Sequence, residues 1–181
     1  MKKMFLKNAK LVLENKLING SILVSENKIE KIFTDKDNLS DFTFDEIIDL
    51  EGKYLGPAFI DVHTHGADGA DAMDGIEEAL RKISSYLAQE GTANFLATTL
   101  TSTKEILKDV LKVVANLQDK DIEGANIFGV HMEGPYFAVE YKGAQNDKYM
   151  KPAGIKELEE YLSVKDGLVK LFSISPHNQE N

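Results

Sequence analysis

The pattern of apolar and polar residues changes near residue 55. Before that point, short stretches rich in Leu, Ile and Val alternate with turn-forming residues; they are residues 10–13, 21–24, 29–33 and 47–50. Apolar residues at alternate positions are typical of half-buried strands, and Asn19-Gly20 and Glu26-Asn27-Lys28 are typical turn sequences. The pattern predicts a small antiparallel β-sheet domain, sandwich-like, at residues 1–54. It has no evident catalytic group.

After residue 55, apolar strands alternate with amphipathic helices. Apolar runs predict strands at residues 58–62, 95–100, 127–131 and 169–175, and apolar residues at helical spacing predict helices at 76–90, 104–117 and 154–162. Such alternation is typical of parallel β/α units whose sheet is covered on both faces. We therefore expect an α/β domain at residues 55–181. Ser102 or Thr103 is expected to cap the second helix.

The composition narrows the kinds of partner. The 181 residues include 21 Lys plus Arg and 30 Asp plus Glu, a net charge of −9. This balance argues against binding nucleic acid or an anionic membrane, because both require a basic surface. The chain has no Cys, so any metal must be held by imidazole, carboxylate or water. No stretch approaches the roughly 20 apolar residues that cross a membrane, and we expect a cytoplasmic location.

Two histidines follow the first buried strand of the α/β region. Residues 58–62 lead directly into His63-Thr64-His65-Gly66. Side chains at i and i+2 of a strand project to the same side, and active sites of β/α barrels lie at the C-terminal ends of the strands. Such a pair alone is more often structural, but the preceding strand and the Gly-rich loop after it favour a metal site. Neutral imidazoles suit zinc, iron, nickel or manganese.

A second pair, His131 and Glu133, lies where the third strand ends at Gly134-Pro135. The same alternation directs Glu133 toward the side of the first histidines, and a carboxylate is a common terminal or bridging ligand of divalent ions. The alternative is a solvated glutamate at a strand end, with His131 in an ordinary hydrogen bond. Considered alone, the two interpretations are balanced. Together with the histidine pair, the pattern favours a metal.

These two motifs, followed by Lys142-Gly143-Ala144-Gln145-Asn146, resemble N-acetylglucosamine-6-phosphate deacetylases of the amidohydrolase superfamily. The resemblance covers essentially the whole chain, although known members are much longer. It implies the first half of a TIM-like β/α barrel, about four of the eight β/α units, at residues 55–181. It also implies hydrolysis of N-acetylglucosamine 6-phosphate to glucosamine 6-phosphate and acetate, and a homodimer in the full-length family.

The resemblance also implies roles for individual residues. Glu133 matches the family's metal ligand, and His63 and His65 match a pair that holds a second metal in some members. We therefore expect one or two divalent ions, with zinc as the first choice and iron, nickel or manganese as the others. The family's catalytic aspartate is expected beyond Asn181, so no catalytic residue is expected in this chain, which would be an incomplete, inactive N-terminal part.

The loop after Glu133 is the expected substrate-binding segment, through Ala144, Gln145 and Asn146. Gln145 stands where the family usually has histidine, and His177 stands where it commonly has glutamate. These departures lend slight support to one alternative, a non-catalytic scaffold fragment. The other alternative is a different amidohydrolase, dihydroorotase-like or aminoacylase-like. The Lys-Gly-Ala sequence argues against it.

Overall fold

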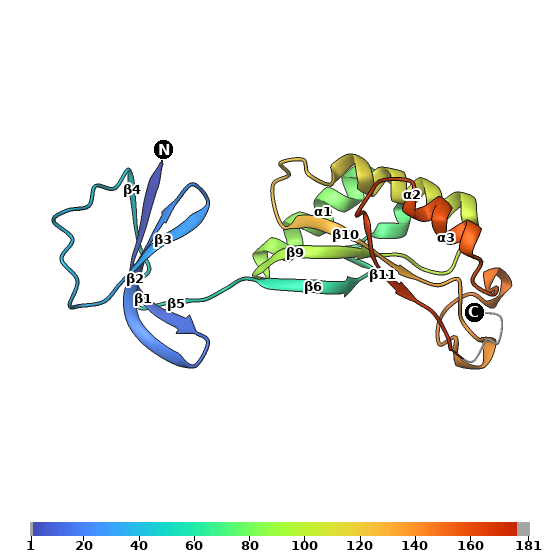
Figure 1. The fold of residues 1–181 in the computed structure, drawn as a ribbon, viewed down its shortest axis with the longest axis horizontal. Helices are drawn as coiled ribbons and strands as arrows, with labels where there is room; N and C mark the ends of the chain where they lie inside the picture. The colour runs from blue at the N-terminus through green and yellow to red at the C-terminus, as the bar shows by residue number, and fades with distance from the viewer. Residues whose placement is uncertain (1, 177–181) are drawn as a thin grey trace. The chain divides into compact units, whose positions relative to one another are not determined.

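A computed structural model describes residues 2–176 of the chain (Figure 1). The chain divides into two compact units, Met1–Pro57 and Ala58–Asn181. The sequence placed this division after residue 54. His177, one of the two departures from the family pattern, lies outside the described residues. No helix among the described residues is both long and apolar enough to span a membrane.

The first unit contains one mixed five-stranded sheet. Its strands are β1 (Lys3–Leu13), β2 (Lys16–Ser25), β3 (Lys28–Phe33), β4 (Glu46–Asp49) and β5 (Tyr54–Leu55). The expected antiparallel pairing is confirmed for β1 to β3. It is wrong for β4 and β5, which pair with β1 in parallel. The long polar connection after β3 returns the chain to the start of β1, so β4 begins in the same direction. The sandwich-like arrangement stays a prediction.

The turn predicted at Asn19-Gly20 is wrong, because β2 continues through both residues. The reversal between β1 and β2 lies at Glu14-Asn15 instead. Gly20 has a packing reason: a Cβ at this position would lie 2.5 Å from the carbonyl oxygen of Phe33. The second predicted turn is confirmed, since Glu26 and Asn27 have φ angles of 52° and 60°, as a tight turn between antiparallel strands requires.

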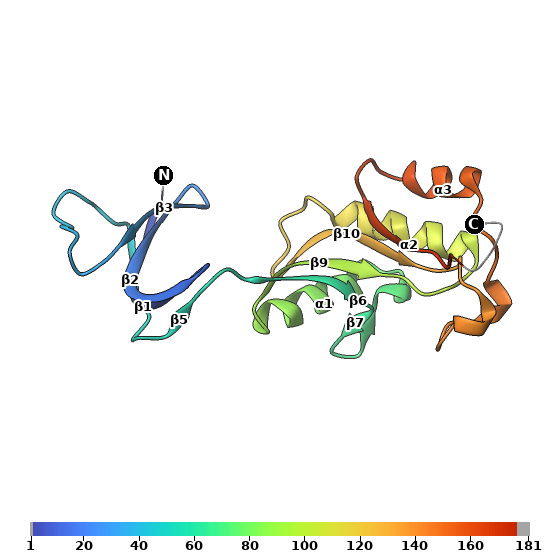
Figure 2. The ribbon, with the colours of Figure 1, turned by 60° about the horizontal axis from the view of Figure 1, so that its bottom comes forward.

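The second unit is built on a parallel four-stranded sheet in the order β11-β10-β9-β6. The strands are β6 (Phe59–Thr64), β9 (Thr92–Thr98), β10 (Asn126–Glu133) and β11 (Val169–Ser173), and the helices are α1 (Glu77–Gln89), α2 (Lys104–Leu117) and α3 (Ile155–Leu162). The predicted strands and helices are thus confirmed, with small shifts of their ends. The expectation of an α/β domain is confirmed as well. Figures 1 and 2 show β6, β9 and β10 side by side.

One continuous apolar core joins these helices to the sheet. Leu80 and Ile83 of α1 and Leu107 and Leu111 of α2 are at most 1% exposed and belong to one buried cluster with Phe95 of β9. The spacing of these residues places them on one face of each helix. The core therefore fixes the strand ends from which the candidate site is built.

Short elements occupy the connections at these strand ends. Strands β7 (Gly66–Ala67) and β8 (Ala70–Asp71) form a hairpin after β6, followed by the 3₁₀ turn η1 (Ala72–Asp74). The long connection between β10 and α3 contains the turns η2 (Val139–Tyr141) and η3 (Asp147–Tyr149). This second connection carries the loop expected to contact substrate.

Candidate metal centre

His63, His65 and Glu133 lie together at the C-terminal ends of β6 and β10. Each offers a ligand atom, and these three atoms lie within 4.8 Å of one another. The atoms Nε2 of His65 and Oε2 of Glu133 are 3.0 Å apart, and both side chains are partly buried. The two motifs are far apart in sequence, and the parallel sheet brings their strand ends to the same edge. This group could hold a divalent ion.

The surroundings of the His65 ring fit a cation. Its Nδ1 lies 3.2 Å from the carbonyl oxygen of Thr98, and its Nε2 faces the carboxylate of Glu133. Both ring nitrogens therefore face an oxygen acceptor, whereas a neutral imidazole carries only one N–H. Nε2 would be free to bind a divalent ion if Nδ1 donates to the Thr98 carbonyl, and such donation to a backbone carbonyl is the usual support of a histidine that binds metal.

Gln145 contacts the same carboxylate oxygen. Its Nε2 donates to Oε2 of Glu133 at 3.0 Å, and its Oε1 accepts from the backbone N–H of Thr101 at 2.7 Å. The residue is only 9% exposed although it lies in a loop. The carboxylate of Glu133 is therefore oriented by a donor that is itself held in place.

His131 lies beside the three donors but makes hydrogen bonds of its own. Its Nδ1 is 3.2 Å from Nδ1 of His63, and its Nε2 is 2.8 Å from the hydroxyl of Ser173 on β11. The pKa of His131 lies below its ordinary value, mainly because the ring is buried and secondly because the imidazole of His63 is close to it. A neutral ring can connect a donor and an acceptor, so His131 links His63 to the next strand.

Comparison with known proteins relates this arrangement to one family. The N-acetylglucosamine-6-phosphate deacetylase of Bacillus subtilis is 29% identical over 182 residues, which cover 98% of this chain and 46% of that protein. The enzyme of the same name from Vibrio furnissii is 34% identical over 122 residues, 67% of this chain and 31% of that protein. The crystal structure of the Pasteurella multocida deacetylase matches with a TM-score of 0.84 and 25% identity, covering 98% of this chain and 46% of that one.

The chain matches the N-terminal part of N-acetylglucosamine-6-phosphate deacetylases. It spans less than half the length of these relatives. The resemblance drawn from the motifs is thus confirmed. No family model matches the chain.

The loop that resembles the deacetylase substrate loop follows Glu133 closely in space. Ala144 and Asn146 are exposed on either side of the buried Gln145. The side chain of Asn146 accepts a hydrogen bond of 3.1 Å from the backbone N–H of Lys148 and so caps η3. Contact of Ala144, Gln145 and Asn146 with substrate stays a prediction.

Two supporting residues were not singled out for this role from the sequence. Thr98 accepts from the backbone N–H of Thr64 through its hydroxyl, at 3.0 Å, while its carbonyl faces His65. Thr101 supplies the N–H that holds Gln145. The run of Thr and Ser at the end of β9 is the only signal for them, and the sequence favoured helix capping by Ser102 or Thr103 over a contact with substrate. Thr103 does cap α2, by accepting from the backbone N–H of Ile106.

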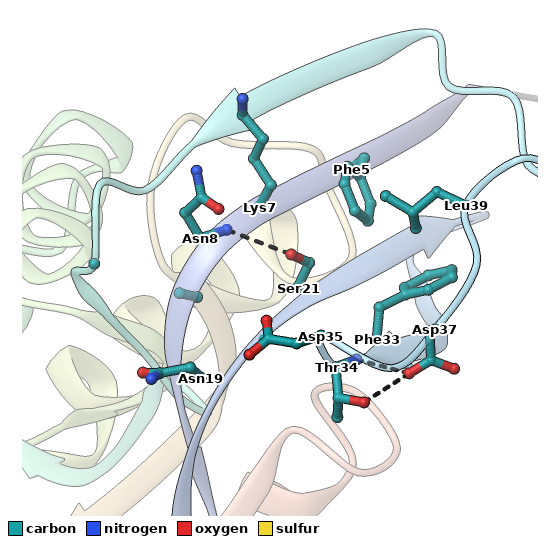
Figure 3. Close-up of a pocket in the computed structure, with 13 residues that line it drawn as sticks. Phe5, Lys7, Asn8, Asn19, Ser21, Phe33, Thr34, Asp35, Asp37 and Leu39 are labelled. Atoms are coloured by element: carbon teal, nitrogen blue, oxygen red, sulfur yellow. Dashed lines mark hydrogen bonds between the residues drawn. The ribbon is translucent and has the colours of Figure 1, made fainter.

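A separate pocket of about 500 Å³ lies in the first unit (Figure 3). Phe5 and Phe33 line it together with polar residues, several of which hydrogen-bond to one another: the Asn8 N–H donates to the Ser21 hydroxyl at 3.3 Å, and the Asp37 carboxylate accepts from Thr34. None of the predicted metal or substrate residues lines this pocket. The deacetylase resemblance therefore points to the strand ends of the second unit.

Proposed function

We propose that this chain provides the metal-binding part of an enzyme that converts N-acetylglucosamine 6-phosphate into glucosamine 6-phosphate and acetate. The observation that carries the proposal is the convergence of His63, His65 and Glu133 in a chain that matches deacetylases over nearly its whole length. The names of the relatives indicate the substrate, and the donor set of this chain indicates the chemistry.

The fold supports a place for the chain in a TIM-like barrel. Four parallel strands lie in sequence order, β6-β9-β10-β11, with helices between them. This is the arrangement of the first four units of an eight-unit β/α barrel, whose active sites lie at the C-terminal ends of the strands. A homodimeric assembly of the whole enzyme and a cytoplasmic location belong to the same proposal.

A divalent ion at this centre would supply Lewis-acid activation of the acetyl carbonyl, and zinc is the first candidate. Nε2 of His65 and Oε2 of Glu133 would hold it, with His63 beside them. The Thr98 carbonyl fixes the His65 ring, and Gln145 fixes the carboxylate. His63 is exposed, so a sugar phosphate can reach the donors from solvent. Iron, nickel and manganese also suit imidazole and carboxylate ligands.

The first test is the metal content of the purified 181-residue chain. After loading with zinc and desalting, we expect stoichiometric zinc by elemental analysis, and loss of most of it in Glu133→Ala. Glu140→Ala is the matched control, because Glu140 is an exposed carboxylate in η2 of the same connection. Equal zinc in both variants would support a scaffold without a metal centre.

The second test concerns the substrate. Residues 1–176 replace the matching segment of the Bacillus subtilis deacetylase, and acetate release from N-acetylglucosamine 6-phosphate is measured. N-Acetylgalactosamine 6-phosphate is the comparison substrate, because a deacetylase named for it from Escherichia coli O157:H7 is 30% identical over 133 residues. A folded chimera that hydrolyses dihydroorotate or N-acyl amino acids and neither sugar phosphate would favour a different amidohydrolase.

A further inference from the structure

We propose that Gln145 is a positioning residue of the metal centre, which fixes the carboxylate of Glu133 through its side-chain amide. The inference rests on the proposed metal site. It concerns how the carboxylate of Glu133 is oriented by a hydrogen-bond partner that carries no charge, the amide of Gln145. Gln145 joins two segments, the end of β9 near Thr101 and the end of β10 at Glu133, through hydrogen bonds of 2.7 and 3.0 Å.

The orientation of the amide is determined by its partners. The backbone nitrogen of Thr101 can only donate, so the atom that faces it at 2.7 Å must be the amide oxygen of Gln145. The amide nitrogen is then directed to the carboxylate of Glu133, which can only accept when ionised. An exchanged oxygen and nitrogen would place two donors together at one end and two acceptors at the other. The chemistry of both ends therefore selects the same orientation.

Burial makes these two hydrogen bonds of the amide costly to break. Gln145 is 9% exposed and Thr101 is 6% exposed, so rotation of the amide would leave a buried donor and a buried acceptor without partners. Each costs about 1–3 kcal/mol. The backbone N–H of Gln145 also donates to the carbonyl of Lys142, at 3.1 Å. This bond fixes the loop from which the side chain extends, and the side chain has little freedom left to turn toward a ligand.

A neutral donor suits a metal ligand better than a cationic one. The amide occupies one lone pair of Oε2 of Glu133 and leaves the carboxylate its full negative charge. The remaining lone pair of Oε2 faces Nε2 of His65, where the ion would lie. A Lys or Arg at position 145 would orient the carboxylate equally well but would repel a divalent ion. Hydrogen bonds of this kind to metal ligands contribute about 10–100-fold to metal affinity.

The test is the affinity of the 181-residue chain for Zn²⁺, measured by competition with a chromophoric chelator. Gln145→Met keeps the length of the side chain without its amide, and we expect an affinity weaker by about 10–100-fold. Gln145→Asn keeps an amide that is one methylene too short to reach both partners, and we expect a similar loss. Glu140→Ala is the control from the same connection, because Glu140 is an exposed residue of η2.

A second readout separates positioning from folding. Bound Co²⁺ has a visible spectrum that depends on ligand geometry, and we expect it to change in both Gln145 variants but not in Glu140→Ala. Thermal unfolding of the metal-free proteins shows which variants are folded. Wild-type affinity and spectrum in either folded Gln145 variant, or an equal loss in Glu140→Ala, would overturn the proposal. Failure of the wild-type chain to bind Zn²⁺ or Co²⁺ would instead overturn the metal centre itself.

Discussion

Glu157 of α3 accepts hydrogen bonds from three side chains, and we predict that Glu157→Gln destabilises the protein in a pH-dependent way. Lys151 and Tyr161 each donate at 2.7 Å, and Tyr136 donates at 3.3 Å. Tyr136 and Tyr161 are fully buried. The cluster ties α3 to the connection between β10 and α3. Burial by itself would raise the pKa of Glu157, but the hydrogen bonds from Lys151 and Tyr161 outweigh it and hold this pKa below its ordinary value.

The magnitude follows from the change from charged to neutral hydrogen bonds. A bond to a charged group contributes about 1.5–3 kcal/mol and a neutral one about 1 kcal/mol, so each phenol bond loses about 1 kcal/mol on replacement by an amide. The side chain of Lys151 is 37% exposed, so water compensates much of its lost ion pair. We expect a total loss of about 2 kcal/mol in the free energy of unfolding at pH 7.

The sign of the pH dependence follows from the lowered pKa of Glu157. The unfolded chain takes up a proton near the ordinary value of 4.5, and the folded chain takes it up at lower pH. The stabilisation is therefore fully present above 4.5 and is lost as the pH falls through the folded-state pKa. The difference between wild type and Glu157→Gln should be about 2 kcal/mol at pH 7 and should shrink toward zero as the pH falls below 4.5 and through the folded-state pKa.

Urea unfolding at a series of pH values, followed by circular dichroism, measures this difference. Glu159→Gln is the control, because Glu159 is exposed on the same helix. It should change the free energy of unfolding by less than about 0.5 kcal/mol at every pH. A Glu157→Gln penalty that stays constant from pH 7 to pH 3, or one no larger than that of Glu159→Gln, would refute the reasoning.

Two further substitutions test the local structure around the site. Gly134→Ala should lower the free energy of unfolding by about 3 kcal/mol, because Gly134 has a φ of 81° and its new Cβ would collide with the hydroxyl of Thr101. Chemical denaturation measures this loss. The second substitution Thr101→Ala, added to Gly134→Ala, should recover part of it. Thr103→Ala should lower the free energy of unfolding by about 1 kcal/mol, because it removes the cap of α2. Thr103→Ser should retain most of the stability in the same assay. An equal loss in both variants would contradict the capping role.

The elements of the second unit were predictable because their periodicity is a local property. In α2, Leu107, Val110, Leu111 and Val114 follow helical spacing, and all four are at most 2% exposed. The convergence of His63, His65 and Glu133 was predictable for a related reason. Parallel strands of one sheet end at the same edge, so motifs at two strand ends are brought to that edge whatever their separation in sequence.

The features that the sequence did not predict depend on contacts between distant segments. Gly20 is required because the end of β3 passes close to it. The neighbouring sequence alone, Asn19-Gly20, instead predicts a turn. The parallel pairing of β4 with β1 depends on the path of a long connection. In both cases the residues carry the right composition for a sheet, but their partners are set by chain topology, which no short window of sequence contains.

Gln145 shows how a departure from a family pattern acquires a physical meaning. The resemblance in the motifs implies a histidine at this position in the family, and a neutral imidazole offers one acceptor nitrogen and one donor nitrogen. Gln145 uses the same two capacities, accepting from the N–H of Thr101 and donating to Glu133. The amide differs from imidazole in that it cannot become cationic. In the proposed metal centre, Gln145 therefore orients the carboxylate as a neutral imidazole would, without a positive charge that would repel the ion.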